Sequence, residues 1–170
     1  MATFISGGSG GLTNYRSYGS FYDTTDQSAL SPNVAYAMKF NNTDADATSG
    51  VSIENNTLGD PTRIQVANAG VYNIQFSAQL YRSTGGTAQT IDIWFRLSET
   101  DIPNSTTKID VKANQNYFVA AWNFFSKMNA NQYIEIMWAV SSTDISIQYD
   151  AISSPHTAIP STIATINQVN

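Results

Sequence analysis

Apolar and polar residues alternate strictly along residues 72–80, within the stretch 70–80. The apolar set is Tyr72, Ile74, Phe76, Ala78 and Leu80, and the polar set is Asn73, Gln75, Ser77 and Gln79. A period of two predicts a β-strand with one face in a core. The polar face carries no charge, although strands that face water usually carry some. We therefore expect the polar set to contact another protein subunit.

Similar alternation predicts further strands on both sides of this one. We expect them at residues 34–40, 51–53, 62–66, 90–97, 108–112, 134–140, 145–149 and 161–169, and we expect a polar loop at residues 41–50. Turn residues such as Asn, Gly and Pro separate these segments, and no segment has a helical period. Many short strands at this spacing predict an all-β sandwich.

The segment from Tyr117 to Met128 is apolar on both faces. Its residues of one parity include Tyr117, Val119 and Ala121, while Phe118, Trp122 and Phe124 have the other parity. Aromatic density and Asn123 favour a strand over the alternative, a helix. A strand buried on both faces lies either at the centre of a layered fold or beneath a partner. We therefore add Tyr117 and Trp122 to the residues expected at a subunit interface.

Residues 1–32 differ in composition from the rest of the chain, and we expect them to form an extended arm ahead of one domain at 33–170. The arm contains a cluster of glycines at residues 7–11, followed by aromatic residues at 15–22. Such a glycine-rich segment has the composition of a linker, and we expect a neighbouring subunit to hold it. A phosphate-binding loop is the alternative, but no Lys-Ser/Thr follows the glycines and no strand precedes them.

Charge and cysteine content exclude several classes of function. Charged residues make up 12% of the chain, the net charge is -5 and no basic cluster occurs, so we expect no binding to nucleic acid. The chain has no cysteine, which excludes disulfides and thiolate metal sites. We find no signal peptide and no apolar run of membrane-spanning length, and we expect no membrane partner.

Residues suited to catalysis or metal binding are few. The single histidine, His156, has no obvious partner in the sequence to orient it for a catalytic triad. Carboxylate pairs of the glycosidase kind are conceivable among Asp92, Glu99, Asp101 and Glu135. Asp44 and Asp46 follow Asn41 and Asn42, so this loop could supply oxygen ligands to calcium, although a plain solvated loop is the interpretation we favour. We therefore expect no enzyme, no catalytic residue, no metal and no cofactor.

Residues 69–76, Ala-Gly-Val-Tyr-Asn-Ile-Gln-Phe, resemble the Gly-x-Tyr-x-aliphatic-x-Phe strand of C1q- and TNF-like jelly rolls. The strands expected at 91–97 and 131–138 follow in the order of that family, and the resemblance extends over residues 34–170. It implies a two-sheet antiparallel jelly-roll sandwich. Two features depart from the pattern: Asn131-Gln132 stands where eukaryotic members have Gly-Asp, and residues 160–166 lack the aromatic-glycine ending.

The Asn-, Thr- and Ser-rich composition and the Ile-Pro-Asn-Ser loop at 102–105 are similar to those of bacteriophage structural proteins that carry this jelly roll. The resemblance implies a non-enzymatic virion protein, a homotrimer with one sheet facing the threefold axis. Such a protein decorates or cements a capsid by bridging neighbouring shell subunits. We then expect Asn73, Gln75, Ser77 and Gln79 near the axis. Contacts with the major capsid protein are expected from four residues of the arm, Phe4, Ile5, Tyr15 and Tyr18.

Two other functions remain open from the sequence. The first is a tail-fibre or spike tip that binds a host receptor or glycan through aromatic side chains such as Tyr81, Tyr117 or Tyr149. We favour decoration because the chain begins at Met1 and no long shaft-forming segment precedes the jelly roll. The second is a hydrolase built on a jelly-roll scaffold, for which the scattered carboxylates are the only support.

Overall fold

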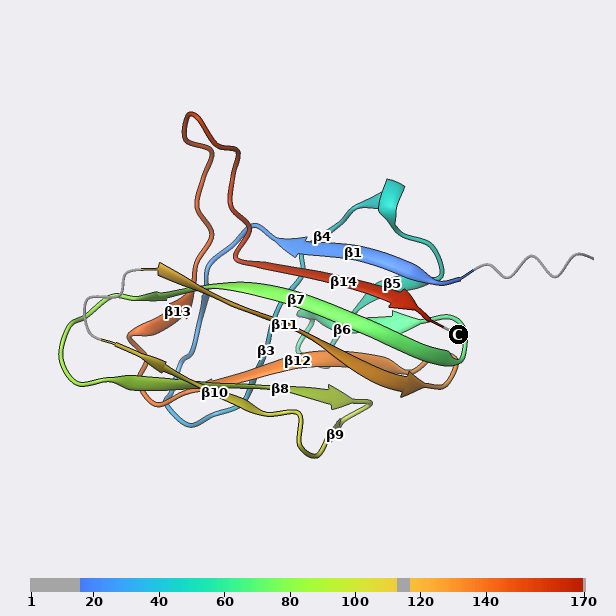
Figure 1. Ribbon diagram of the computed structural model, residues 1–170, viewed down its shortest axis with the longest axis horizontal. Helices are drawn as coiled ribbons and strands as arrows, with labels where there is room; N and C mark the ends of the chain where they lie inside the picture. The colour runs from blue at the N-terminus through green and yellow to red at the C-terminus, as the bar shows by residue number, and fades with distance from the viewer. Residues whose placement is uncertain (1–15, 113–116, 170) are drawn as a thin grey trace, which may run out of the picture.

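The computed structural model describes residues 16–112 and 117–169, which fold into two antiparallel sheets packed face to face (Figure 1). The one helical element of the described residues is a short 3-10 helix at Ala45–Ala47. The prediction of an all-β, two-sheet sandwich of the jelly-roll kind is therefore confirmed.

The first sheet is built around the long strand β7. Its strands are β1 (Tyr18–Asp23), β2 (Gln27–Ser28), β4 (Asn42–Thr43), β7 (Gly70–Arg82), β11 (Tyr117–Met128), β13 (Ile145–Ile147) and β14 (Thr162–Gln168). Strand β7 pairs with β11 along one side. On its other side it pairs with β14 and, near its C-terminal end, with β13. Strand β1 follows β14, and β4 follows β1.

The second sheet has β12 near its centre. Its strands are β3 (Tyr36–Ala37), β5 (Val51–Asn55), β6 (Pro61–Val66), β8 (Gln89–Leu97), β9 (Thr100–Asp101), β10 (Thr107–Val111) and β12 (Tyr133–Val140). The main path runs β10-β8-β12-β6-β5. Strand β6 pairs with the start of β12, at Tyr133 and Ile134, and β3 pairs with β12 further along, at Met137 and Trp138. Strand β9 forms a hairpin with β8.

Side chains of alternating parity from both sheets fill the core. The row predicted to point inward from residues 70–80 is buried, with exposed fractions of at most 5%. In the second sheet, β8 contributes Ile91, Ile93 and Phe95, all at 0%. The rings of Phe76 and Phe95 meet edge to face with centroids 5.9 Å apart, which joins the two sheets. Each such side chain contributes about 1.5–3 kcal/mol by leaving water.

Strand β12 is buried on both faces, as is the short β13, whereas the segment from Tyr117 to Met128 is not. Five consecutive residues, 134–138, are buried in β12. Strand β11 pairs within the described residues only with β7, so it forms an edge of the first sheet (Figure 1). The central position expected as one alternative for residues 117–128 is therefore wrong, and cover by a partner remains the other alternative.

Part of the predicted arm belongs to the sandwich. Strand β1 pairs with β14 over six residues, and Phe21 of β1 is fully buried in the core. The arm predicted at 1–32 and the sandwich thus share β1 (Tyr18–Asp23) and β2 (Gln27–Ser28). Phe4, Ile5 and Tyr15 lie outside the described residues.

The segment 34–40 is less regular than its alternation predicts. Only Tyr36 and Ala37 pair as a strand, and Val34 is 44% exposed, whereas Met38 and Phe40 are buried as expected. The predicted polar loop at 41–50 contains β4 and the 3-10 helix. Asn131 has a φ of 64° at the turn predicted before β12, a left-handed conformation that Asn tolerates well.

Candidate functional site

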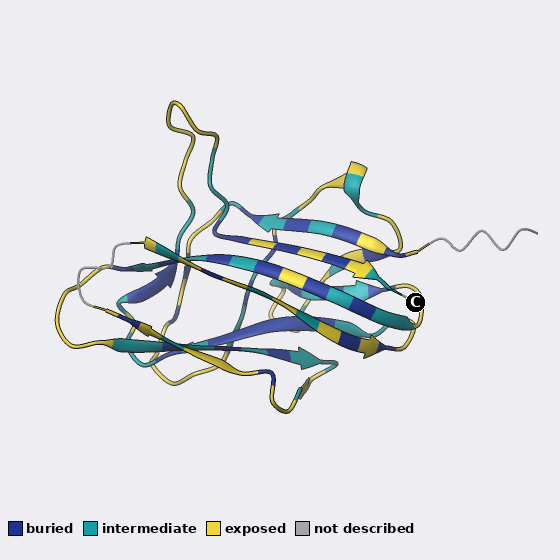
Figure 2. Ribbon diagram, in the orientation of Figure 1, coloured by how far each residue is buried: buried dark blue, intermediate teal, exposed yellow. Residues whose placement is uncertain are grey.

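The four polar residues of the opening strand lie on the outer face of β7. In β11, Gln79 pairs with Val119, Ser77 with Ala121, Gln75 with Asn123 and Asn73 with Phe125. In β14, Ser77 pairs with Ile163, Gln75 with Thr165 and Asn73 with Asn167. Paired residues point to the same side of a sheet. We call this continuous outer surface of β1, β7, β11 and β14 the first-sheet face (Figure 2).

Exposed apolar side chains gather on the first-sheet face. Tyr117, Val119 and Phe125 of β11 are 58%, 54% and 56% exposed, and Ile163 of β14 and Tyr18 of β1 are 37% and 44% exposed. These five are more than half of the nine large apolar side chains that are exposed among the described residues. Apolar side chains concentrated on one face are typical of an interaction surface, whereas single scattered ones are ordinary.

Amide groups occupy the middle of the first-sheet face. Asn123 Nδ2 donates a hydrogen bond to Asn73 Oδ1 at 3.2 Å, and Asn73 Nδ2 donates one to Asn167 Oδ1 at 3.5 Å. Each amide has more donors and acceptors than these bonds use. A shallow hollow of about 200 Å³ lies beside them, lined by Gln75, Phe76, Ser77, Ile163 and Thr165. The face therefore offers both apolar contact and uncharged hydrogen bonding.

The aromatic residues predicted for the interface divide between two faces. The ring of Tyr117 lies on the first-sheet face, 5.0 Å from that of Tyr81. Tyr18, which was predicted to contact the capsid and not another copy, lies on the same face, paired with Asn167. Trp122 instead points into the sandwich, where its ring meets Phe76 edge to face at 4.6 Å. The structure thus brings Tyr117 and Tyr18 together with the polar set, and turns Trp122 toward the core.

Val119, Phe125 and Ile163 were absent from the predicted interface. Val119 and Phe125 share the parity of Tyr117, so the alternation in β11 carried a signal for both. Ile163 reaches this face only because β14 pairs with β7, and the sequence gives no direct sign of that pairing.

Three of the four candidate carboxylates lie at the outer face of the second sheet, around two arginines. Arg63 pairs with Glu99 and lies 3.8 Å from Glu135. Arg96 donates to Asp101 at 2.7 Å, and this hydrogen bond is the main cause of the raised pKa of Arg96 and the lowered pKa of Asp101. The remaining candidate, Asp92, pairs with Lys108 at 3.6 Å.

Tyr133 completes the group around Glu99. Its hydroxyl donates to Glu99 Oε1 at 2.7 Å, and the Arg63 guanidinium lies 4.4 Å from the centre of its ring. Burial, followed by the hydrogen bond to Glu99, raises the pKa of Tyr133 to about 12. The phenol therefore stays protonated at neutral pH and acts as a hydrogen-bond donor rather than as a nucleophile.

Glu99 occupies an unusual backbone position. Ser98 and Glu99, with φ angles of 43° and 70°, join β8 to β9 as a two-residue turn. Turns of this kind usually have Asn-Gly, because side chains with a Cβ disfavour positive φ. Such strain is found most often where a side chain must hold a particular position. Here it directs the carboxylate of Glu99 to Arg63 and Tyr133.

The other candidate residues are solvated. His156 lies in an exposed loop at 150–157, where its Nδ1 is 2.8 Å from the backbone oxygen of Thr157. Asp44 and Asp46 are exposed at the 3-10 helix. In residues 16–112 and 117–169, no three His, Cys, Asp or Glu side chains are grouped to hold a metal ion. No helix in those ranges is long and apolar enough to span a membrane.

No protein-family model matches the chain, and a search of curated proteins finds no match.

Proposed function

We propose that this chain is a non-enzymatic structural protein of a bacteriophage virion, which assembles as a homotrimer and decorates a capsid. The trimer bridges and stabilises neighbouring subunits of the major capsid protein. The first-sheet face forms the contact between copies, and the N-terminal arm reaches the shell.

The observation that carries the proposal is the exposed apolar strip on β11, next to the uncharged amides of β7. Val119 and Phe125 are more than half exposed on an edge strand, and only Lys127 adds a charge to the outward residues of β11. Long edge strands that are left open usually carry charges or bulges, which prevent pairing with other chains. A second copy on this face would remove the apolar side chains from water and pair the free amide groups.

A closed ring of three copies brings two different patches of each copy together, because its contacts are heterologous. The first-sheet face offers two such patches. One is the apolar strip of β11, and the other is the hollow between β7 and β14 that exposes Ser77 and Ile163. Small residues such as Ala121 and Ser77 make room for a side chain from the next copy.

Measurement of the molar mass in solution by light scattering tests this assembly. We expect a trimer for the unsubstituted chain and a monomer for Val119→Asp combined with Phe125→Asp, because burying the carboxylates would be costly. Ile152→Asp is the matched control, since Ile152 is also exposed, at 75%, but lies in the loop at 150–157. A monomer of the unsubstituted chain at micromolar concentration would contradict the proposal.

The close pair of Tyr81 and Tyr117 favours a second candidate function, a tail-fibre or spike tip that binds a host receptor or glycan. Exposed aromatic rings offer the apolar faces of sugars a stacking surface. The double variant Tyr81→Ala and Tyr117→Ala distinguishes the candidates. Loss of binding to host cells with an unchanged molar mass supports the tip, and loss of the trimer supports the assembly.

A further inference from the structure

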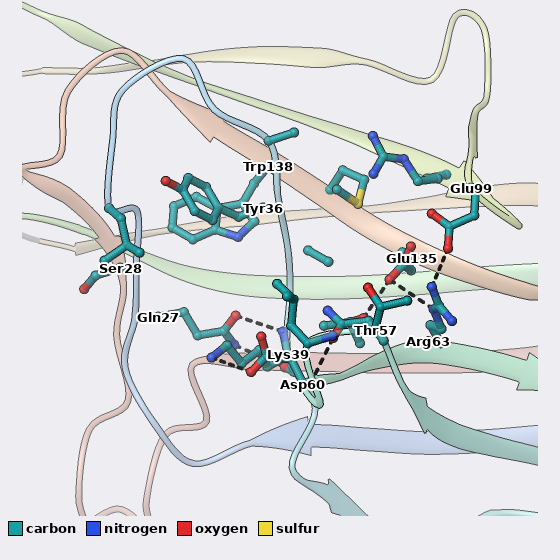
Figure 3. Close-up of a pocket in the computed structure, with 18 of the residues that line it drawn as sticks. Gln27, Ser28, Tyr36, Lys39, Thr57, Asp60, Arg63, Glu99, Glu135 and Trp138 are labelled. Atoms are coloured by element: carbon teal, nitrogen blue, oxygen red, sulfur yellow. Dashed lines mark hydrogen bonds and ion pairs between the residues drawn. The ribbon is translucent and has the colours of Figure 1, made fainter.

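A pocket of about 460 Å³ opens beside the outer side of the second sheet, and Figure 3 shows residues that line it. Its walls come from residues 26–39 with β2 and β3, the loop at 56–60, the outer side of β12, and residues of β6, β8 and the β8–β9 turn. Glu135 and Met137 of β12, at 4% and 3% exposed, lie against it. This pocket differs from the shallow hollow on the first sheet because charged, polar and apolar residues all line it and because Glu135 is buried.

The carboxylate of Glu135 is buried in this pocket with few partners. Its Oε1 accepts a hydrogen bond from Thr62 Oγ1 at 2.6 Å, whereas Arg63 Nε is 3.8 Å away, too far for a hydrogen bond. Among the described residues Thr62 alone donates a hydrogen bond to Glu135, and the other oxygen, Oε2, accepts none. A buried carboxylate whose nearest cation, Arg63, is shared with Glu99 and lies beyond hydrogen-bond distance is only partly compensated. Glu135 is therefore an acceptor that a ligand can satisfy.

Charge in the pocket favours a cation. Four carboxylates and three cationic side chains line it, and Asp101 neutralises one of these cations, Arg96, from outside. Lys39 pairs with Asp60 at 3.0 Å, and Arg63 is shared between Glu99 and Glu135. Every cation of the wall thus has its own carboxylate, and negative charge remains in excess. An anionic ligand would find no free cation among these residues.

Aromatic and aliphatic groups in the part of the pocket away from Glu135 fit the stem of a long side chain (Figure 3). The rings of Tyr36 and Trp138 lie 5.7 Å apart at one side of the pocket (Figure 3). Trp138 is 1% exposed, and no described residue accepts a hydrogen bond from its indole nitrogen.

The mouth of the pocket points to a protein rather than a small molecule as the source of the cation. Leu30 and Leu58 line the mouth from two loops and are 88% and 85% exposed. A small amine inside the pocket would leave both leucines in water. A protein surface around the inserted side chain would cover them, as the residues around a central anchor do in protein interfaces.

We infer that this pocket binds a lysine side chain of a partner protein, with the ammonium at Glu135, the stem against Tyr36 and Met137, and the backbone around it on Leu30 and Leu58. Lysine fits better than arginine because Glu135 Oε1 is already bonded to Thr62. A guanidinium prefers both oxygens of a carboxylate, whereas an ammonium needs one. The inference concerns a second surface and holds whether or not copies of the chain assemble through the first-sheet face.

Titration with Nα-acetyl-lysine methylamide, followed by the three tryptophan indole N–H signals in ¹H–¹⁵N spectra, tests the inference. We expect a saturable shift of the Trp138 signal at millimolar concentration. The signal of Trp94, whose indole donates to Asp101 at 2.8 Å outside the pocket wall, should move less. The norleucine analogue, which has a similar stem without the charge, should leave both signals in place. An equal shift with norleucine, or no shift with lysine at tens of millimolar, would overturn the inference.

Two sets of variants locate the binding. Glu135→Gln should weaken the lysine amide about tenfold or more, because a charge-assisted hydrogen bond is lost. Glu54→Gln, which makes the same charge change at an exposed residue of β5, should not. Neither variant should alter the molar mass, so failure here is separable from failure of the trimer. Equal affinity for both variants would contradict the assignment of Glu135.

The exposed leucines provide a test that does not disturb a buried group. Leu30→Ser combined with Leu58→Ser should weaken the pentapeptide acetyl-Ala-Leu-Lys-Leu-Ala-amide several-fold and leave the lysine methylamide unchanged. If the peptide binds no more tightly than the single amide and ignores both substitutions, the partner is not a protein and the inference is wrong.

Discussion

The guanidinium of Arg82 lies inside the sandwich near the end of β7, with only 2% of its side chain exposed. Its Nε donates to Asp144 Oδ2 at 3.0 Å, and its Nη1 donates to the backbone oxygen of Val111 at 2.9 Å. These contacts connect β7 to Val111, the last residue of β10, and to Asp144, which directly precedes β13. A charge at this depth is tolerated only while its partners remain.

Removal of Arg82 should therefore leave an uncompensated carboxylate. We expect Arg82→Met to lower the free energy of unfolding by about 3–5 kcal/mol, measured by urea denaturation. The exposed pair of Lys39 and Asp60 is the control, and Asp60→Asn should change the free energy by less than about 1 kcal/mol. Similar losses for the two variants would mean that Arg82 contributes no more than a surface charge.

The buried pair of Arg82 and Asp144 also predicts that the stability of the fold depends on pH. Burial alone would raise the pKa of Asp144, but the hydrogen bonds that it accepts, among them those from Thr84 and Arg82, lower the pKa below its ordinary value. The pair therefore stabilises the fold above the ordinary pKa of an aspartate, about 3.9, and this contribution is lost as the pH falls through the lower folded value. Asp144→Asn should flatten the acid side of the stability curve in urea denaturation at a series of pH values. An acid side as steep as that of the unsubstituted chain would contradict this account.

At the scale of elements, β14 closes the first sheet between β7 and β1. Its residues alternate between the core and the first-sheet face, so one strand serves both packing and the proposed assembly. Ile166 is 2% exposed and pairs with Ile74, while Ile163 is 37% exposed and pairs with Ser77.

These two isoleucines make a matched pair for substitution. Ile166→Ala should destabilise the fold by about 2–5 kcal/mol, because it opens a cavity in the core. Ile163→Ala should cost the isolated subunit less than about 1 kcal/mol and should instead weaken association. Thermal unfolding and dilution followed by light scattering measure the two effects. Equal destabilisation by both substitutions would show that the outer row also belongs to the folded core.

Much of the strand pattern was predictable because alternation is a local property. The inward row of β7, the start and end of β11 and the last strand all follow from neighbouring residues. The strand order is not local: nothing near Phe21 indicates that β1 pairs with β14, almost the whole chain away. Trp122 was assigned to the interface because both faces of its segment are apolar, and apolar content alone does not distinguish core from contact.

Glu99 and Glu135 were named among the candidate carboxylates, but their grouping with Arg63 on the second sheet was not predicted, because it too depends on strand order. Arg63, Glu99 and Glu135 come from β6, the β8–β9 turn and β12, and only the folded sheet brings them together. Each is an ordinary solvated charge in the sequence. Glu135 in particular has the parity of an outward residue, and the loops that cover it are not foreseeable from β12.

At the scale of the whole molecule, the proposed trimer contact and the lysine pocket occupy different sheets. A trimer built through the first-sheet face would leave the second sheet on its outside, where the pocket can receive a side chain from a shell protein. The proposed arm offers an independent link to the same shell. The two contacts with the capsid would therefore add through effective concentration, so that the loss of either one weakens binding strongly.

Deletion of residues 1–15 tests the arm without disturbing β1, whereas deletion of 1–32 would remove a strand whose Phe21 is fully buried. We expect the shortened chain to remain a trimer and to bind purified shells at least about tenfold more weakly, because it loses one of two linked contacts. Cosedimentation with shells measures the binding, and Glu54→Gln serves as a control with an intact arm. If the shortened chain binds shells fully while isolated trimers bind host cells, the arm makes no capsid contact and the fibre-tip function is the better explanation.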